Sequence, residues 1–437
     1  MPSLASSKIA RPKLTRPRIE RDFALLFMVM LVIGAGNTAL QSVMPAIGRS
    51  LKIHDNVIAV AFSVSALVWV IAAPIWARKS DHTGRRRMVL VGLAGFSVSV
   101  LLCAVFLTAG IQGLISPIAT IVAFVCARVI YGLFGAAAPP AAQAILASRT
   151  TREDRTKALT LLASAFGLGT ILGPALAPFF VLPGVGLAGP AYFFAFTGFV
   201  VLAATWARLP NDTPGIVTRG AVTSYPSIGG NLTGASVTAA VSEPSTAVLK
   251  ITDARIWPWM LVGLVMGHAQ AMAGQAMGFL VLDRLGVDPT LGQQSVGLVL
   301  MTGAFAALLV QWGLIPLLNM APRSLVITGL ALGGAGCLMI SASNTLYGLS
   351  VAFALTSAGF GFARPGYTAG SSLAVGPELQ GAVAGRVTSI NGASFVLGPS
   401  IGIGLYEVWQ PLPYLFAALL AFALLVYAVM RIEKTSD

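Results

Sequence analysis

The sequence carries very little charge for its length. Only 10% of its 437 residues are Asp, Glu, Lys or Arg, whereas 56% are hydrophobic and the mean hydropathy is +0.83. A soluble domain carries about 25% charged residues, because its surface has to face water. This composition excludes a soluble globular protein and predicts an integral membrane protein.

Cysteine and histidine are also scarce. The three cysteines (Cys103, Cys126 and Cys337) lie inside apolar runs, so we expect small packing residues and no disulfide framework. The three histidines are scattered, and neither a His-Glu-x-x-His motif nor a Walker-type phosphate loop occurs. Residues 184–189 match Gly-x-Gly-x-x-Gly, but no strand precedes them. We therefore predict no metal, no cofactor and no enzymatic activity; a polytopic membrane enzyme is the less favoured alternative.

Positive charge is the one kind of charge in excess, with a net value of +13. In a soluble protein this would suggest a nucleic-acid partner. Here the cations cluster in alternate loops: six precede residue 22, five lie within 77–90 and four within 149–157. The intervening loops hold few cations, namely Arg49, Lys52 and Arg284. Because Lys and Arg mark the cytoplasmic side of a membrane protein, we predict that both termini are cytoplasmic, that lipid is the charged partner, and that no nucleic acid binds.

The apolar runs predict twelve membrane spans. A helix needs about 20 apolar residues to cross the hydrocarbon core. The predicted spans are 23–47, 57–77, 88–110, 117–147, 158–181, 190–209, 256–282, 293–318, 324–342, 345–372, 380–408 and 411–431. The fourth, tenth and eleventh are long, so we expect them to bend or to begin outside the membrane.

A Ser-, Thr-, Gly- and Pro-rich stretch divides the spans six and six. It has the composition of a linker and lies on the cytoplasmic side of the predicted topology. The predicted parts are a basic tail (1–22), a first six-helix bundle (23–209), the linker (210–255), a second six-helix bundle (256–431) and a short cytoplasmic tail (432–437). A shift of 225 residues places Gly173-Pro174 on Gly398-Pro399 and Pro140 on Pro365. This pattern predicts two pseudo-symmetric bundles with a site between them at mid-depth.

The stretch "ARKSDHTGRRR", between the second and third spans, resembles a signature of the major facilitator superfamily. That signature reads Gly-x-x-x-Asp-Arg/Lys-x-Gly-Arg-Arg/Lys, and Asp81, Gly84, Arg85 and Arg86 match it. Ala77 and His82 depart from it. The turn needs a residue that tolerates positive φ, which glycine does. The resemblance implies that Asp81 and Arg85 help to hold the two bundles together on the cytoplasmic side in one conformation, whereas cations in such a loop can also serve only to orient the protein.

Two further motifs follow. Arg128 and Gly132 in the fourth span partly match a buried-arginine motif of the same family, and Gly169, Gly173 and Pro174 resemble the core of its antiporter motif. Close helix packing by small residues with a bend is the structural interpretation of the second motif. Taken together, the motifs resemble the twelve-span drug:proton antiporter branch.

Several polar residues fall on the spans that line the cavity in the resembled fold. Arg128 lies about 15 Å into the fourth span, where a charge is costly and usually functional. The candidate cavity residues are Asn37, Gln41, Gln275 and Arg364, beside Arg128. Two arginines and several amides would suit an anionic or polyhydroxy ligand. Each arginine could instead satisfy backbone carbonyls, and His268 and Gln270, two positions apart, cannot share one helix face.

Proton coupling has few candidates, because no Asp or Glu lies at mid-depth in a span. His268 in the seventh span and Asp283 near its outer end are the candidates. The alternative for His268 is a packed side chain bonded to a neighbouring carbonyl.

These observations predict a monomeric secondary active transporter in a plasma or bacterial inner membrane, exporting small organic molecules by alternating access with the proton as coupling ion. An uptake or facilitated carrier of an anionic metabolite is the alternative, and a non-transporting sensor a further one.

Overall fold

The computed structural model describes residues 16–150, 152–211, 226, 228, 250, 252–376 and 379–432. In this part of the chain the regular structure is helical, apart from one β-bridge between Leu182 and Gly186. The predicted all-α class is confirmed. Of the predicted linker, only residues 210, 211, 226, 228, 250 and 252–255 lie within the described residues.

The helices fall into two successive sets. The first set is α1 (Arg16–Ser50), α2 (Asp55–Thr83), α3 (Arg85–Ile111), α4 (Pro117–Ile130), the π-helix η1 (Tyr131–Gly135), α5 (Ala138–Arg149), α6 (Arg152–Leu176), the 3-10 helix η2 (Ala177–Phe180) and α7 (Gly189–Arg208). The second set is α9 (Trp257–Leu285), α10 (Pro289–Leu308), the π-helix η3 (Leu309–Leu314), α11 (Ile315–Leu318), α12 (Pro322–Ala342), α13 (Leu346–Leu373), α14 (Gln380–Val408) and α15 (Leu412–Arg431). We call the first set the N-half and the second the C-half.

Ten helical stretches within the described residues are long and apolar enough to cross a membrane. Two further helices, α9 and α14, are 29 residues long each. They have the length of a span, but polar residues such as Gln270, Gln275 and Asn391 lower their hydropathy. Ten apolar helices and two long, more polar ones agree with the twelve predicted spans. Helices α9 and α14 therefore belong to the interior of the molecule, because their buried polar side chains need hydrogen-bond partners that lipid cannot supply.

The fourth span is broken, as its length led us to expect. Ser116 caps α4 by accepting a hydrogen bond from the backbone N–H of Ala119 at 3.2 Å. The helix then passes through η1 before α5 resumes at Ala138, followed by two prolines. Gly132 lies in η1, where an added Cβ would come within 2.5 Å of the Ser65 carbonyl oxygen on α2. Glycine therefore lets the π-helix, three residues after Arg128, approach α2 closely.

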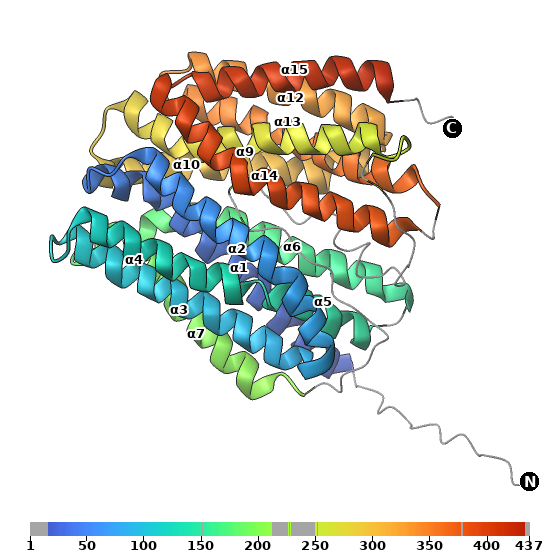
Figure 1. Cartoon of the computed structure of the whole chain (residues 1–437), viewed down its shortest axis with the longest axis horizontal. Helices are drawn as coiled ribbons and strands as arrows, with labels where there is room; N and C mark the ends of the chain where they lie inside the picture. Colours follow the sequence, from blue (N-terminus) through green and yellow to red (C-terminus); the bar gives the residue numbers. More distant parts are fainter. Residues whose placement is uncertain are drawn as a thin grey trace, which may run out of the picture.

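The N-half and the C-half lie side by side, and α1 begins at the same end of the molecule at which α15 finishes (Figure 1). We call this end the terminal face and the opposite end, where α1 finishes at Ser50, the distal face. Contacts between the halves lie towards the distal face. The Ser63 and Ser400 hydroxyls are 2.8 Å apart between α2 and α14, and the backbone N–H of Asn56 donates to the Glu407 carboxylate at 3.0 Å.

The same glycine packing recurs in both halves. Gly169 and Gly173 of α6 lie against the α1 backbone, and an added Cβ at Gly173 would clash with the Ala35 carbonyl oxygen. In the C-half, a Cβ at Gly398 of α14 would lie 2.6 Å from the Ala271 Cβ on α9. Gly173 and Gly398 are the pair related by the sequence repeat, so the repeat corresponds to an equivalent helix contact in each half.

Candidate functional site

Arg128 is fully buried near the end of α4. Its Nη2 donates a hydrogen bond to Oδ1 of Asn37 on α1. The guanidinium also lies over two aromatic rings, 5.2 Å from the Phe62 centroid and 4.5 Å from the Tyr131 centroid. Cation–π contact of this kind stabilises a desolvated cation. The described hydrogen bond therefore goes to a side-chain amide of the same half and not to a backbone carbonyl.

Arg364 makes the equivalent contact in the C-half. It is buried in α13, and its Nη2 donates to Oε1 of Gln270 on α9. Arg128 and Asn37 are on the fourth and first spans, and Arg364 and Gln270 are on the tenth and seventh. Each half thus contributes one arginine–amide pair at equivalent spans. The Nη1 atom of Arg364 is buried and has no hydrogen-bond partner among the described residues, which leaves a donor available to a ligand.

A cavity lies between the halves and reaches Arg364. Its lining comes from α6, α9, α10, η3 and α13, together with one residue of the linker: Thr170, Ile171, Pro174, Ile228, Gln270, Leu300, Gly303, Ala304, Ala307, Gln311, Phe353, Ser357, Phe360, Gly361 and Arg364. The lining is mainly apolar with a few convergent polar groups, which is the usual composition of a small-molecule site.

Asn37 and Gln41 contact the linker rather than one another. The side-chain nitrogens of both residues donate to the Pro226 carbonyl, at 2.5 Å from Asn37 and 3.1 Å from Gln41. Gln275 is buried in α9 but is not among the residues that line the cavity. Of the predicted cavity residues, Arg364 lines the cavity, as does Gln270, while Asn37 and Gln41 contact Pro226, two residues before the cavity-lining Ile228. Gln270 is not among the predicted cavity residues, although its spacing from His268 requires only that one of the two faces elsewhere.

His268 is partly buried, and its Nδ1 lies 2.8 Å from the Leu264 carbonyl oxygen, one turn earlier in the same helix. A carbonyl only accepts, so Nδ1 carries the proton in this contact. The arrangement matches the packed histidine that we gave as the alternative to a coupling role.

The Gly-x-x-x-Gly-Pro run of α6 lies at two interfaces. Its glycines pack against α1 within the N-half, as described above. Pro174 also lines the cavity, and its carbonyl oxygen would lie 3.1 Å from a Cβ at Gly297 on α10 of the C-half. The motif therefore combines close packing inside one half with a contact across the two halves.

The basic stretch 77–87 is helical except at Gly84. Only Gly84 separates the two helices, and it adopts φ = +95°. A side chain at this φ is strained, so the turn requires glycine. Arg85 is buried and donates to the Ala144 carbonyl at 3.2 Å, while Arg86 donates to Oδ1 of Asn211 at 2.9 Å. The Arg85 contact lies within the N-half, and the Arg86 contact goes to a linker residue that follows α7 closely. Asp81 is in the last turn of α2, and its side chain lies outside the described residues.

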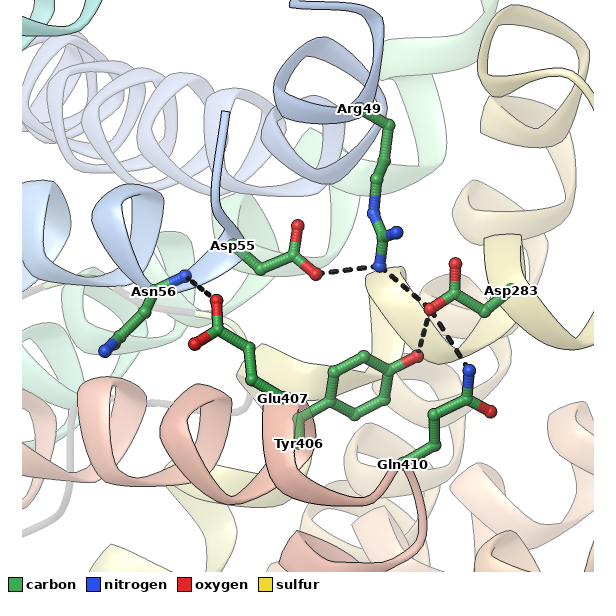
Figure 2. Close-up of polar contacts among 7 residues, drawn as sticks. All are labelled: Arg49, Asp55, Asn56, Asp283, Tyr406, Glu407 and Gln410. Carbon is green, nitrogen blue, oxygen red and sulfur yellow. Dashed lines mark hydrogen bonds and ion pairs between the residues drawn. The ribbon is translucent and has the colours of Figure 1, made fainter. Parts of the chain in front are cut away.

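The distal face carries a polar network that joins the two halves (Figure 2). The Arg49 guanidinium lies between two carboxylates, 2.7 Å from Asp55 and 2.8 Å from Asp283. Tyr406 donates to Asp283 at 2.6 Å, and Gln410 does so at 3.4 Å. Lys52 and His54 line the same depression.

The network draws on both halves. Arg49 and Asp55 belong to the N-half, whereas Asp283, Tyr406 and Glu407 belong to the C-half. One arginine therefore bridges two carboxylates from different halves, and a change in the protonation of either acid changes the attraction between the halves. We predicted Asp283 as a candidate but not its partners. The clustering of Arg49, Asp55, Asp283 and Glu407 at span ends on one side was the available signal.

A polytopic helical protein with a cavity between two pseudo-symmetric halves has the architecture of a membrane transporter. The comparison of the sequence with protein families agrees: the profile described as "Major Facilitator Superfamily" matches residues 26–319. The chain belongs to this superfamily.

The chain is similar over most of its length to transporters of known name. It is 23% identical over 423 residues to "Multidrug resistance protein 2" of Bacillus subtilis (strain 168), covering 95% of this chain and 96% of that protein. It is 23% identical over 430 residues to "Tetracycline resistance protein, class H" of Pasteurella multocida, covering 94% and 96%. The crystal structure of the human organic anion transporter MFSD10 (TETRAN) shares the fold, with a TM-score of 0.63 at 19% identity, covering 95% of this chain and 100% of that one.

Proposed function

We propose that the chain is a secondary active transporter that exports small organic molecules in exchange for protons by alternating access. The observation that carries the proposal is the cavity between the halves, which α6 of the N-half lines together with the buried Arg364–Gln270 pair of the C-half. A ligand there touches elements that move relative to each other when the halves rock, which is the requirement for alternating access. The names of two full-length relatives, a multidrug and a tetracycline resistance protein, favour export of organic molecules.

In the proposed orientation the terminal face is cytoplasmic, because the basic clusters lie there. The distal face is then external, and the Arg49–Asp283 bridge closes the cavity to the outside. We place the protein in a plasma or bacterial inner membrane as a monomer of two six-helix bundles, 23–209 and 256–431, joined by a cytoplasmic linker at 210–255. Arg85, Arg86, Gly84 and Asp81 then belong to the cytoplasmic turn that helps to hold the halves together in the opposite conformation.

Asp283 is our first candidate for the coupling proton and His268 the second. A proton on Asp283 removes one charge of the bridge between the halves, so proton binding from outside favours opening of the distal face. His268 has its Nδ1 engaged with Leu264, which supports a structural role. The proposal is thus specific: coupling should fail in Asp283→Asn and persist in His268→Gln.

The test is transport by the purified full chain in oriented proteoliposomes. With tetracycline or a fluorescent lipophilic cation as the probe, an imposed proton gradient should drive uphill movement, and substrate addition should release protons to a pH-sensitive dye. If both variants, Asp283→Asn and His268→Gln, transported normally with an unchanged pH dependence, neither residue would carry the proton.

A carrier for anionic metabolites is the second candidate. The buried Nη1 of Arg364, which has no hydrogen-bond partner in the described part of the chain, favours it, because a carboxylate would satisfy that donor. In the same vesicles, movement of a small dicarboxylate without any dependence on the proton gradient would favour this carrier over the exporter.

A further inference from the structure

Two residues of the linker lie inside the membrane domain. Pro226 is buried, and its carbonyl oxygen accepts hydrogen bonds from Asn37 and Gln41. The backbone N–H of Ile228 donates to Oε1 of Gln41 at 3.0 Å. Gln41 therefore donates a hydrogen bond to the Pro226 carbonyl and accepts one from the backbone N–H of Ile228. Its side-chain amide pairs with the linker as a backbone peptide group would.

The same segment reaches the other half. Ile228 lines the cavity together with Gln270 and Arg364. Its carbonyl oxygen lies 3.3 Å from the position of a Cβ at Gly274 on α9. Pro226 thus contacts α1, and Ile228 lies between α1 and the helices α9 and α13, so these two linker residues occupy space between the two halves.

Arg128 determines which atom of Asn37 faces this segment. Arginine has donors but no acceptor, so the Asn37 oxygen turns to the Arg128 guanidinium and the Asn37 nitrogen turns to Pro226. Gln41 lies one helical turn later on the same face of α1. The two amide nitrogens therefore converge on one acceptor, a geometry that selects a carbonyl or carboxylate oxygen and rejects an ammonium group.

The chain is long enough to place the segment there and to withdraw it. About fifteen residues separate Pro226 from Asn211, the last described residue after α7. At about 3.4 Å per extended residue they span about 50 Å, whereas half of the hydrocarbon core is about 15 Å. A tethered ligand of this kind has an effective concentration in the millimolar range, so it competes with free ligands of modest affinity.

We infer that Asn37 and Gln41 form a subsite of the transport cavity that recognises peptide-like amides, and that Pro226 and Ile228 of the linker occupy it as an internal competitor. The ligand class is a molecule with an acyl oxygen and, two residues or an equivalent distance further on, an N–H donor, flanked by apolar groups. This inference rests on the proposed export function, which identifies the cavity as the transport site. Its test measures peptide binding and not transport.

The test compares two full-length proteins in detergent. In the first, residues 225–228 are replaced by a Gly-Ser sequence of equal length; the second is the natural chain. The probe is the capped peptide acetyl-Tyr-Pro-Ser-Ile-amide, which has the sequence of residues 225–228. It should bind the linker-substituted protein at least about tenfold more tightly than the natural chain, because the internal competitor is gone. A Gly-Ser replacement of residues 240–243 is the matched control and should leave binding weak.

Two variants make the subsite itself testable. In the linker-substituted background, Gln41→Leu should weaken peptide binding at least about tenfold, since two hydrogen bonds are lost. A peptide with an N-methyl group on the isoleucine nitrogen should lose affinity for the Gln41 protein and not for the Leu variant. Equal binding of the peptide to both linker forms, or binding insensitive to Gln41 and to N-methylation, would overturn the inference. Peptide binding without any transport would instead count against the proposed export function alone.

Discussion

Arg49 at the end of α1 and Asp283 near the end of α9 form an ion pair of 2.8 Å that joins the N-half to the C-half. Arg49 also contacts Asp55 of its own half at 2.7 Å. Asp55 thus fixes the position of Arg49 within the N-half, and Asp283 connects Arg49 to the C-half. This relationship links the charge of a single carboxylate to the closure of the distal face, and the first prediction follows from it.

Asp283→Asn should weaken distal closure and reduce the pH dependence of transport. The amide keeps the shape of the carboxylate but lacks its charge, so it imitates the protonated acid. The charged carboxylate of Asp283 attracts Arg49, so distal closure should be weaker in the variant than in the natural chain. Labelling of a cysteine placed at Ser63, in a background without native cysteines, should become faster at neutral pH in the variant. An unchanged labelling rate and pH profile would mean that the bridge plays no part in closure.

Ser63 and Ser400 provide a direct test of the distal contact. Their hydroxyl oxygens are 2.8 Å apart on helices of different halves. A disulfide has an S–S length of about 2.05 Å, so paired cysteines here need little backbone movement. The double variant S63C/S400C should cross-link under mild oxidation and stop transport, and reduction should restore it. Each single-cysteine variant serves as control and should transport under both conditions. Transport that continues through the fully cross-linked protein would contradict opening at this face.

Arg128→Lys should reduce transport roughly tenfold or more. Lysine lacks the planar guanidinium that lies over Phe62 and Tyr131 while it donates to Asn37. Loss of one charge-assisted hydrogen bond costs about 1.5–3 kcal/mol, which is about 10- to 150-fold in an equilibrium. Transport rates in proteoliposomes measure the effect, with protein amount and melting temperature checked in parallel.

Arg323→Lys is the matched control for this substitution. Arg323 donates to the carbonyl oxygens of Val429 and Ile432 near the terminal face, away from the cavity. It should change transport less than twofold, by the usual small effect of surface substitutions. Equal losses in both variants would show that any Arg-to-Lys change harms the protein and would remove the case for a specific role of Arg128.

The features that the sequence predicted well are those that a short window contains. Membrane spans depend on about 20 consecutive side chains, and Gly84 alone determines a turn with positive φ. Arg128 is conspicuous because a charge inside an apolar run is costly wherever the run packs. Such signals do not depend on the neighbouring helices, so the all-α membrane class and the burial of Arg128 could be predicted.

The pairings between residues could not be predicted in the same way. The bridge from Arg49 to Asp283 joins positions 234 residues apart, and no local pattern relates them. Gln270 illustrates a second limit: helical periodicity separates it from His268, but only the packing of α9 decides which of the two faces Arg364. The burial of Pro226 illustrates a third limit, because nothing in a Ser- and Gly-rich stretch indicates that its proline packs between helices.

Gly173→Ala should destabilise the protein because α6 and α1 leave no room for a methyl group. An added Cβ at Gly173 would clash with the Ala35 carbonyl oxygen and would lie 2.8 Å from the Ala39 backbone nitrogen. Overpacking of this kind costs about 1–3 kcal/mol, and here the obstacle is backbone that cannot rotate away. The measurement is the melting temperature of the detergent-solubilised protein, which should fall by several degrees.

Gly385→Ala is the control for this effect, because nothing lies within 4 Å of a Cβ at that position in α14. At an open helical position, replacing glycine by alanine stabilises the folded protein by about 0.4–1 kcal/mol, because the unfolded chain has less conformational entropy to lose. The melting temperature should therefore stay the same or rise slightly. Gly398→Ala, the counterpart of Gly173 in the sequence repeat, should behave like Gly173→Ala, since its Cβ would lie 2.6 Å from that of Ala271. If Gly173→Ala melted like Gly385→Ala, the small-residue contact between α1 and α6 would not be a packing constraint, and the equivalence of the two halves at this motif would lose its physical basis.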